Sequence, residues 1–174
     1  MPETPDKLPI VVYPNPGLRI KCAPVETFDE KLAALARSMI AVMHAAEGVG
    51  LAAPQIGVPI RLFVCNATGK PEDDRVYVNP VLSEPEGAAT DDEGCLSIPG
   101  VTVAVRRAEK CSISGLDVQG RPVSASGDGL LARCWQHEVD HLDGRLIIDK
   151  MSEGDAIANR KKLRELEAKA KKRK

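Results

Sequence analysis

The clearest periodic pattern in the chain lies between residues 27 and 48. Apolar side chains recur there every three or four residues, a spacing that places them on one face of an α-helix. Thr27 and Glu30 form a capping box, and Gly48 can end the helix. The pattern therefore predicts a helix that packs on the core through one apolar stripe. This stripe consists of Leu32, Leu35, Met39, Val42, Met43 and Ala46.

Shorter runs, rich in apolar and β-branched residues, predict β-strands through much of the chain. They occupy residues 10–13, 60–65, 76–82, 101–106, 110–118 and 121–125. The last two runs flank Gln119-Gly120 and predict a hairpin. Pro80 indicates that its strand is interrupted or lies at a sheet edge. The acidic, glycine-containing residues 83–92 predict a loop.

A second helix is predicted to begin at Asp128 or a neighbouring cap residue and to stop at Gly144. Trp135 within it is expected to pack this helix into the core. The apolar residues 146–148 predict a short strand, and Ser152 caps a last helix that becomes strongly basic. The chain is therefore expected to contain a helix near each end and a third helix before the last one.

Composition indicates a soluble globular protein, because 43% of the 174 residues are hydrophobic and 28% are charged. No run approaches the roughly 18 apolar residues of a membrane helix, and residues 1–7 lack the features of a signal peptide. The five cysteines contain no Cys-x-x-Cys pair, which favours free thiols in a reducing compartment. We therefore expect one domain, residues 1–174, located in the cytoplasm and not in a membrane.

The near-zero net charge hides an asymmetry along the chain. Residues 160–174 contain nine Lys or Arg and two Glu, a net charge of +7. The remaining residues contain 15 basic and 23 acidic side chains, a net charge of −8. This basic tail has two interpretations, a solvated and partly frayed helix or a surface that binds nucleic-acid phosphates.

The candidate chemistry centres on the segment Gln136–Gly144. His137 and His141 are four residues apart, so on a helix they share one face, with Cβ atoms about 5–6 Å apart. Glu138 lies between them and can act on a water molecule without being a metal ligand. This His-Glu-x-x-His pattern is typical of metal-dependent hydrolases. An amphipathic helix with two ordinary histidines is the alternative, but the chain has only three histidines.

A catalytic metal site of this kind needs a third protein ligand. The metzincin proteases have a third histidine at the position where this chain has Ile147. Cys134 is seven residues from His141, a rise of about 10.5 Å along a helix, which is too far for one ion. Cys95, flanked by Gly94 in a turn, is the cysteine best placed to complete a Cys-His-His set. Its alternative interpretation is a small buried thiol.

The glycine- and alanine-rich segment Gly48–Gln55 predicts a backbone that a ligand or another chain approaches closely. A simple connector between a helix and a strand is the alternative. Phosphate binding is disfavoured, because the segment lacks a third glycine and follows a helix rather than a strand. The Gln55 amide could donate a hydrogen bond to a substrate carbonyl.

Three of these segments resemble the signature motifs of the peptide deformylases. They are Gly48–Gln55, Glu93–Ser97 and Gln136–Gly144, and the segment Tyr13–Arg19 is similar to the start of that family. The resemblance extends from Ile10 to Lys150 in the family's order. It implies an α+β fold, with antiparallel or mixed sheets packed around a central His-Glu-x-x-His helix, an N-terminal helix and a C-terminal helix.

The resemblance also implies an activity, the removal of the formyl group from the formyl-methionine of nascent polypeptides. Cys95, His137 and His141 would hold a ferrous ion, for which zinc, nickel or cobalt can substitute. Glu138 would act as general base and acid, while Gln55 and the backbone N–H of Leu96 would hold the oxyanion. The residues expected to contact substrate are Gly48, Val49, Gly50, Glu93, Gly94, Arg107, Leu130, Arg133 and Cys134.

Among these, Val49, Leu130 and Cys134 are expected to form the walls of the methionine pocket. Arg133 would line the pocket mouth with its aliphatic stem, and Arg107 would lie near the peptide path. The basic tail would then contact the ribosome, where the substrate emerges, and the protein is expected to act as a monomer.

Two other functions remain open from the residues. One is a His-Glu-x-x-His peptidase that uses a downstream carboxylate such as Glu165 as its third ligand. The other is a catalytically inactive relative that binds the ribosome. Intact Gln55, Cys95 and Glu138 disfavour the second function.

Overall fold

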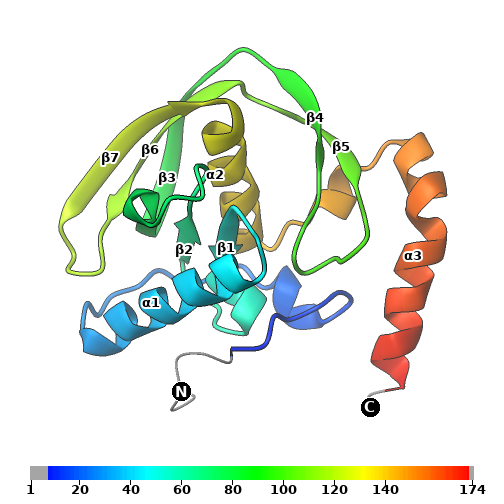
Figure 1. The fold of residues 1–174 in the computed structure, drawn as a ribbon, viewed down its shortest axis with the longest axis horizontal. Coiled ribbons are helices and arrows are strands. Elements are labelled where there is room, and N and C mark those ends of the chain that lie inside the picture. The colour runs from blue at the N-terminus through cyan, green and yellow to red at the C-terminus, as the bar shows by residue number, and fades with distance from the viewer. Residues whose placement is uncertain (1–7, 173–174) are drawn as a thin grey trace.

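A five-stranded antiparallel sheet, in the order β1-β2-β3-β6-β7, forms the main layer of the structure. A second sheet pairs β4 with β5. The strands are β1 Gly50–Ala52, β2 Leu62–Cys65, β3 Arg75–Glu86, β4 Ala89–Glu93, β5 Val103–Arg107, β6 Lys110–Leu116 and β7 Pro122–Asp128. The structure, a computed structural model, describes residues 8–172 (Figure 1).

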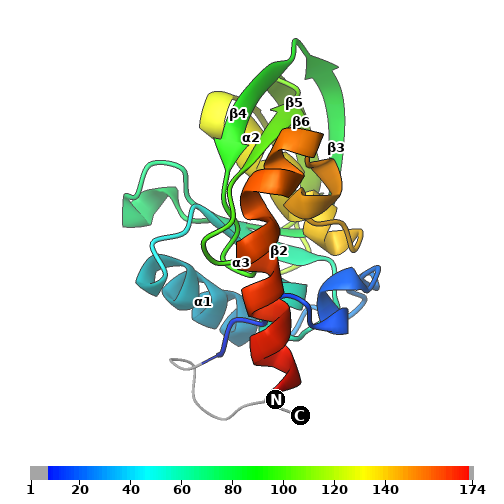
Figure 2. The same cartoon turned by 90° about the vertical axis from the view of Figure 1, so that its right-hand side faces the viewer.

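Within the described residues, three α-helices surround and fill this framework: α1 Glu30–Ala45, α2 Gly129–Leu142 and α3 Glu153–Lys171. Helix α2 packs against strands of the main sheet and has β4 and β5 on its other side, so it is the central helix (Figure 1). Helix α1 packs on β1 and β2, while α3 lies along the edge of the molecule beside β4 and β5 (Figure 2). The predicted α+β fold with a central His-Glu-x-x-His helix is confirmed.

The N-cap residue of helix α1 lies two residues after the predicted cap, Thr27. Asp29 is this N-cap residue, and the Asp29 carboxylate accepts a hydrogen bond of 3.0 Å from Leu32 N. The predicted capping box of Thr27 with Glu30 is therefore wrong, because an aspartate cap of comparable strength stands nearer to the apolar stripe. The stripe itself packs as expected, with Met39 fully buried.

The predicted loop at residues 83–92 is also wrong. Strand β3 continues to Glu86 and β4 begins at Ala89, with Gly87 at φ +64° between them. Residues 83–86 and strand β4 are extended because β6 and β5 pair with them, although most of these residues are polar and exposed. Backbone pairing with distant strands thus overrides local composition here.

Two short apolar runs predicted as strands have other structures. Residues 147–150 form a 3₁₀ helix, whose first turn is closed by a hydrogen bond of 2.8 Å from Leu146 N to Asp149. Residues 10–12 have no regular secondary structure and Tyr13 begins a turn, so they belong to none of the strands of the described chain. Val11 N instead donates to Gln55 O at 2.7 Å, and Tyr13 N donates to Ser97 O at 2.8 Å. This segment therefore holds the backbone at Gln55 and at Ser97 in place.

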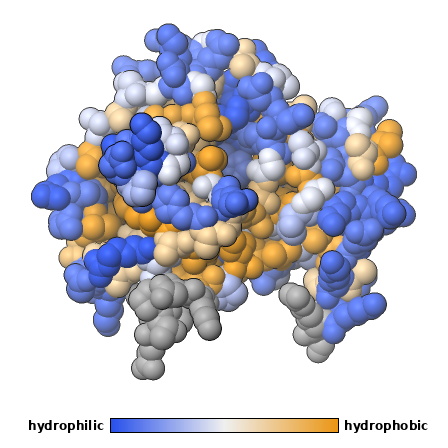
Figure 3. All heavy atoms as spheres, viewed as in Figure 1, coloured by the Kyte–Doolittle hydropathy of each residue, from blue (hydrophilic) through white to orange (hydrophobic). Residues whose placement is uncertain are grey.

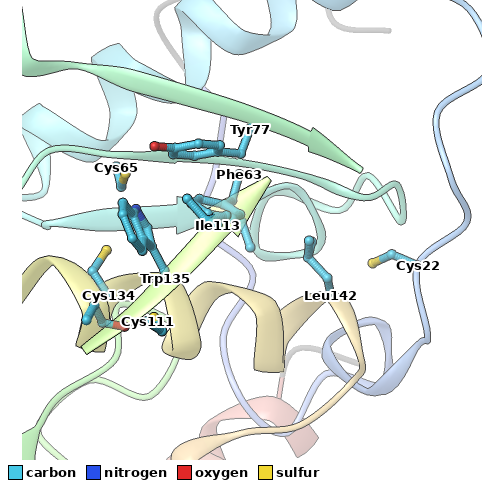
Figure 4. Close-up of a cluster of buried hydrophobic side chains, with 11 residues drawn as sticks. Cys22, Phe63, Cys65, Tyr77, Cys111, Ile113, Cys134, Trp135 and Leu142 are labelled. Carbon is cyan, nitrogen blue, oxygen red and sulfur yellow. Dashed lines mark hydrogen bonds between the residues drawn. The ribbon is translucent and has the colours of Figure 1, made fainter. Parts of the chain in front are cut away.

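The core between α2 and the main sheet is built around Trp135, as predicted. Trp135 is 1% exposed and meets Tyr77 edge-on, with ring centroids 5.9 Å apart. Figure 4 shows this side chain beside Phe63 and Cys65 of β2. Because Trp135 anchors one face of α2 to the sheet, the neighbouring face of the helix can point towards the segment that follows β4. Within residues 8–172, no helix is both long and apolar enough to cross a membrane.

Candidate metal centre and active-site cavity

Three side chains from two distant segments meet at one point. Cys95 lies in the turn after β4, while His137 and His141 lie one turn apart on α2. Cys95 Sγ is 3.3 Å from His141 Nε2, and the two histidine Nε2 atoms are 3.2 Å apart. The three donor atoms all lie within 4.8 Å of one another. The structure thus brings together the Cys-His-His set that the sequence indicated.

These three donors fit a single divalent metal ion. Metal bonds of about 2.0–2.3 Å in a tetrahedral arrangement put neighbouring donors roughly 3.3–3.6 Å apart. The two donor–donor separations of 3.2 and 3.3 Å are close to this range. Thiolate and imidazole together suit iron, zinc, nickel and cobalt, so the donor set alone does not choose among them. Three protein ligands leave a position for water or substrate.

The turn that carries Cys95 is fixed by its own backbone. Ile98 N donates to Cys95 O at 2.9 Å, and Gly100 adopts φ +76°, which favours glycine. Strand β4 ends at Glu93, so the thiol projects from the first residues after a paired strand. Pairing of β4 with β5 therefore determines where along helix α2 the Cys95 thiol lies.

Glu93 orients one of the two histidines. Glu93 Oε2 is 3.0 Å from His137 Nδ1, and two buried guanidinium groups, of Arg107 and Arg133, also donate to the Glu93 carboxylate. Burial by itself would raise the pKa of Glu93, but the hydrogen bonds from Arg107 and His137 outweigh burial and hold this pKa well below its usual range. The anionic Glu93 therefore accepts the Nδ1 proton and leaves His137 Nε2 free for a metal.

The position of Arg107 corrects a sequence-based expectation. Its side chain is buried, donates to Glu93 and reaches Asp140 at 2.9 Å, and it does not line the cavity. Arg107 is therefore placed to hold the Glu93 carboxylate and not to contact a peptide directly. The sequence shows that residue 107 is an arginine, but the direction in which its side chain points depends on how β5 packs on α2.

Replacing Glu93 with Gln is expected to destabilise the protein by about 3–5 kcal/mol, because buried Arg107 and Arg133 lose a shared counter-charge. It should also weaken metal binding by about 10–100-fold, since His137 loses its orienting anion. Urea unfolding and metal competition measure the two effects. Glu165→Gln is the matched control, because Glu165 is exposed on α3 and pairs only loosely with Lys162 at 3.8 Å. Equal stability of both variants would contradict this role of Glu93.

Glu138 lies beside the metal ligands in a nearly water-free position. Its side chain is 3% exposed, and Oε2 finds no hydrogen-bond partner among the described residues. Burial raises the pKa of Glu138 to about 7, which nearby His137 and Arg107 only partly oppose. A carboxyl group with such a pKa can both take and release a proton near neutral pH.

Gln55 presents its amide nitrogen to the same centre. Ala52 N donates to Gln55 Oε1 at 2.8 Å, and a backbone N–H can only donate, so the amide oxygen is fixed. Gln55 Nε2 therefore points towards Ser97 Oγ at 3.2 Å and Cys95 Sγ at 3.7 Å. The side chain is 1% exposed, so this donor is held rigidly.

A cavity of about 490 Å³ opens beside this centre. On the face of the molecule drawn in Figure 3, apolar surface gathers in the middle, between polar clusters. Of the residues expected to contact substrate, all except Arg107 line the cavity: Gly48, Val49, Gly50, Glu93, Gly94, Leu130, Arg133 and Cys134. Val49 and Leu130 are 40% and 50% exposed and form apolar parts of its mouth.

The cavity also has wall residues that no motif in the sequence indicated. Ile98, Val101 and Thr102 line the wall that follows Cys95. Their proximity to Cys95 in the chain was the only available signal, and it does not say which of them face inwards. The middle of the Gly48–Gln55 segment is more than a simple connector, because Gly50–Ala52 form edge strand β1.

The site as a whole has the features of one class of enzyme. A cysteine sulfur and two imidazoles around one point, with a buried glutamate and an amide donor beside an open cavity, are the features of a mononuclear metal-dependent hydrolase. Within residues 8–172, Cys95, His137 and His141 are the only group assembled in this way. Glu165, the alternative third ligand, is exposed on α3 and does not belong to this group.

Comparison with known proteins gives the family. A family model described as polypeptide deformylase matches residues 7–156. A peptide deformylase of Alkalilimnicola ehrlichii is 46% identical over 160 residues, covering 91% of this chain and 90% of that one. The chain therefore belongs to the polypeptide deformylase family, whose members are hydrolases.

Solved structures agree with this membership. A peptide deformylase from Legionella pneumophila matches with a TM-score of 0.87 and 43% identity, covering 95% of this chain and 98% of that one. A peptide deformylase from Plasmodium falciparum matches with a TM-score of 0.90 and 39% identity, covering 94% and 97%. The similarity thus includes the whole region that carries the site.

Proposed function

We propose that this protein hydrolyses the N-terminal formyl group of formyl-methionyl peptides and releases formate. The observation that carries the proposal is the Cys95-His137-His141 cluster, with the Glu138 carboxylate beside it in one cavity. Turnover of formyl-Met-Ala, scored by released formate, tests it directly. A protein that binds metal but releases no formate would contradict the proposal.

The three donors would hold one divalent metal, with ferrous iron expected and zinc, nickel or cobalt as alternatives. When bound, such an ion can lower the pKa of water from 15.7 to about 7 and so supply hydroxide at neutral pH. Metal analysis of protein purified without oxygen would identify the ion. The geometry of the three donors supports a metal site, and the expectation of iron rests on the resemblance to the family.

Glu138 is proposed to move the proton. It takes a proton from water, the resulting hydroxide attacks the formyl carbon, and Glu138 returns that proton to the amide nitrogen when the C–N bond breaks. The leaving group is then the amine of methionine, and the other product is formic acid, which gives its proton to the amine or to solvent and leaves as formate. Its burial and its pKa of about 7 support both halves of this cycle.

Gln55 and the backbone N–H of Leu96 are proposed to stabilise the oxyanion. The formyl oxygen gains negative charge during attack, and donors fixed in advance stabilise it without reorganising. The fixed amide nitrogen of Gln55 supports this role, and Leu96 lines the cavity directly after Cys95. In other enzymes, one such donor contributes about 3–4 kcal/mol to catalysis.

The cavity is proposed to bind the methionine side chain. Val49, Leu130 and Cys134 supply apolar walls, and the stem of Arg133 lies beside them. Strand β1 is an edge of the main sheet, so an extended peptide can pair with its backbone near Gly50. This arrangement supports a linear peptide substrate over a compact one.

The basic face of α3 is proposed to contact ribosomal RNA, where nascent chains emerge into the cytoplasm. Arg160, Lys161 and Arg164 are exposed on this helix, whereas Leu166 is buried in the core. Deleting the whole tail would therefore also remove core packing, and replacing charges is the cleaner test. The last two residues of the basic tail lie outside the described part of the chain.

Replacing Arg160, Lys161 and Arg164 together with Gln is expected to reduce co-sedimentation with ribosomes at low salt, because three phosphate contacts are lost. The difference should shrink as salt rises, since counterion release weakens all such contacts. A control with the same charge change replaces exposed Lys21, Lys31 and Arg37 with Gln. Equal pelleting of both variants would rule out this docking surface.

A further inference from the structure

Gly50, the first residue of β1, leaves space for the carboxylate of Glu138. A Cβ atom on residue 50 would lie 2.3 Å from Glu138 Oε1 and 2.8 Å from Cys134 Sγ. Carbon atoms attract one another best at about 3.5–4.0 Å, so both separations are strongly repulsive. The Glu138 carboxylate therefore occupies the volume that any other residue at position 50 would need.

The backbone itself does not require glycine at this position. Gly50 of β1 pairs with Cys65 of β2, and the φ angle of Gly50 lies outside the left-handed region. An L-residue could adopt the same extended backbone without strain. Gly100 in the turn after Cys95 differs, because its φ of +76° favours glycine. Space, and not backbone conformation, is therefore the constraint on residue 50.

Packing, rather than polar contacts, holds Glu138 against this space. Its side chain is 3% exposed, and Oε2 has no hydrogen-bond partner among residues 8–172. Helix α2 cannot retreat as a whole, because Trp135 anchors it in the core and His137 and His141 meet Cys95. A methyl group at position 50 would therefore displace the Glu138 carboxylate, because this side chain can move more freely than helix α2.

We infer that Gly50 is a positioning residue, whose missing side chain determines where the Glu138 carboxylate stands relative to the metal ligands. This role is separate from any contact between the Gly50 backbone and a peptide. Its kinetic consequence rests on the proposed deformylase function, whereas the steric relation between Gly50 and Glu138 does not.

The first test is Gly50→Ala in the metal-loaded protein. The value of kcat for formyl-Met-Ala is expected to fall by about 10²-fold, because a shift of about 1 Å in a catalytic group has this effect. KM and metal content should stay close to wild type, since neither the metal donors nor the backbone of β1 changes, whereas the melting temperature should fall, because overpacking a buried position typically costs about 1–3 kcal/mol. Gly154→Ala is the control, because its Cβ would meet only Ser152 Oγ at an ordinary 3.7 Å. An unchanged kcat, or a loss carried by KM, would overturn the inference.

The second test is a double-mutant cycle between residues 50 and 138. If Gly50 acts only through the carboxylate, adding Gly50→Ala to Glu138→Gln should cause little further loss of kcat. Independent effects would instead multiply. Multiplying losses would overturn the inference and would favour a direct role of Gly50 in substrate binding.

The third test does not depend on turnover. Crystal structures of metal-free wild type and Gly50→Ala should differ in the position of the Glu138 carboxylate, while Cys95, His137 and His141 superpose. An unmoved carboxylate would overturn the inference, whatever the kinetics. If wild type releases no formate, the proposed function fails, and this comparison still decides the role of Gly50.

Discussion

Replacing Glu138 with Gln is expected to lower formate release from formyl-Met-Ala by about 10²–10⁴-fold, the usual contribution of a general acid–base group. Glutamine keeps the shape of the side chain but cannot take up a proton from water or return one to the amine. The bound metal should stay at the wild-type level, because all three donors remain. Steady-state turnover and metal analysis of the same sample measure both quantities.

The matched control is Glu86→Gln, which removes an equal charge from an exposed position at the end of β3. This variant should keep wild-type turnover. If Glu138→Gln turned over at a rate near wild type, the general-base assignment would be wrong. If it lost metal instead, Glu138 would support the ligands and its kinetic effect would be indirect.

Replacing Cys95 with Ala is expected to remove the metal from the protein and reduce formate release to background. Loss of an orienting residue typically weakens metal binding by about 10–100-fold, so loss of a direct ligand should exceed about 100-fold. The two histidines alone would leave an ion without the third protein ligand of a catalytic site. Metal content after dialysis, measured beside turnover, shows both losses.

Cys111→Ala is the control for this substitution. Cys111 is a buried thiol on β6 in the core cluster around Trp135, shown in Figure 4, and it is not part of the metal group. The variant should be somewhat less stable and yet keep its metal. If Cys95→Ala retained one metal per chain, the third ligand would have to be another residue, and the deformylase assignment of the site would fail.

Local patterns predicted the elements whose stability is itself local. The stripe of α1, the hairpin of β6 and β7, and the helix that carries His137 and His141 all follow from spacing along the chain. The i, i+4 relation of the two histidines requires nothing beyond helix geometry. The Ser152 cap of α3 is of the same kind, since Ser152 Oγ accepts a hydrogen bond from Asp155 N at 3.1 Å.

Predictions went wrong where distant partners decide the conformation. Residues 83–92 look like an acidic loop, yet β5 and β6 pair with most of them. Arg107 looks like a peptide-binding cation, yet Glu93 and Asp140 bind it in the interior. In both cases the local sequence offers a polar segment, and only the neighbouring strand or helix determines whether that segment faces water.

The sequence by itself determined the chemistry of this protein: two imidazoles and a carboxylate at helical spacing, a thiol in a glycine-bounded turn, and an amide in a segment of small residues. The tertiary structure decided that Cys95 reaches the histidines, that the Gln55 amide nitrogen points towards Cys95, and that Glu138 fits against Gly50. The physical reason is range. Helical spacing is fixed within one turn, whereas contacts across 40 or more residues depend on how the sheets pack around α2.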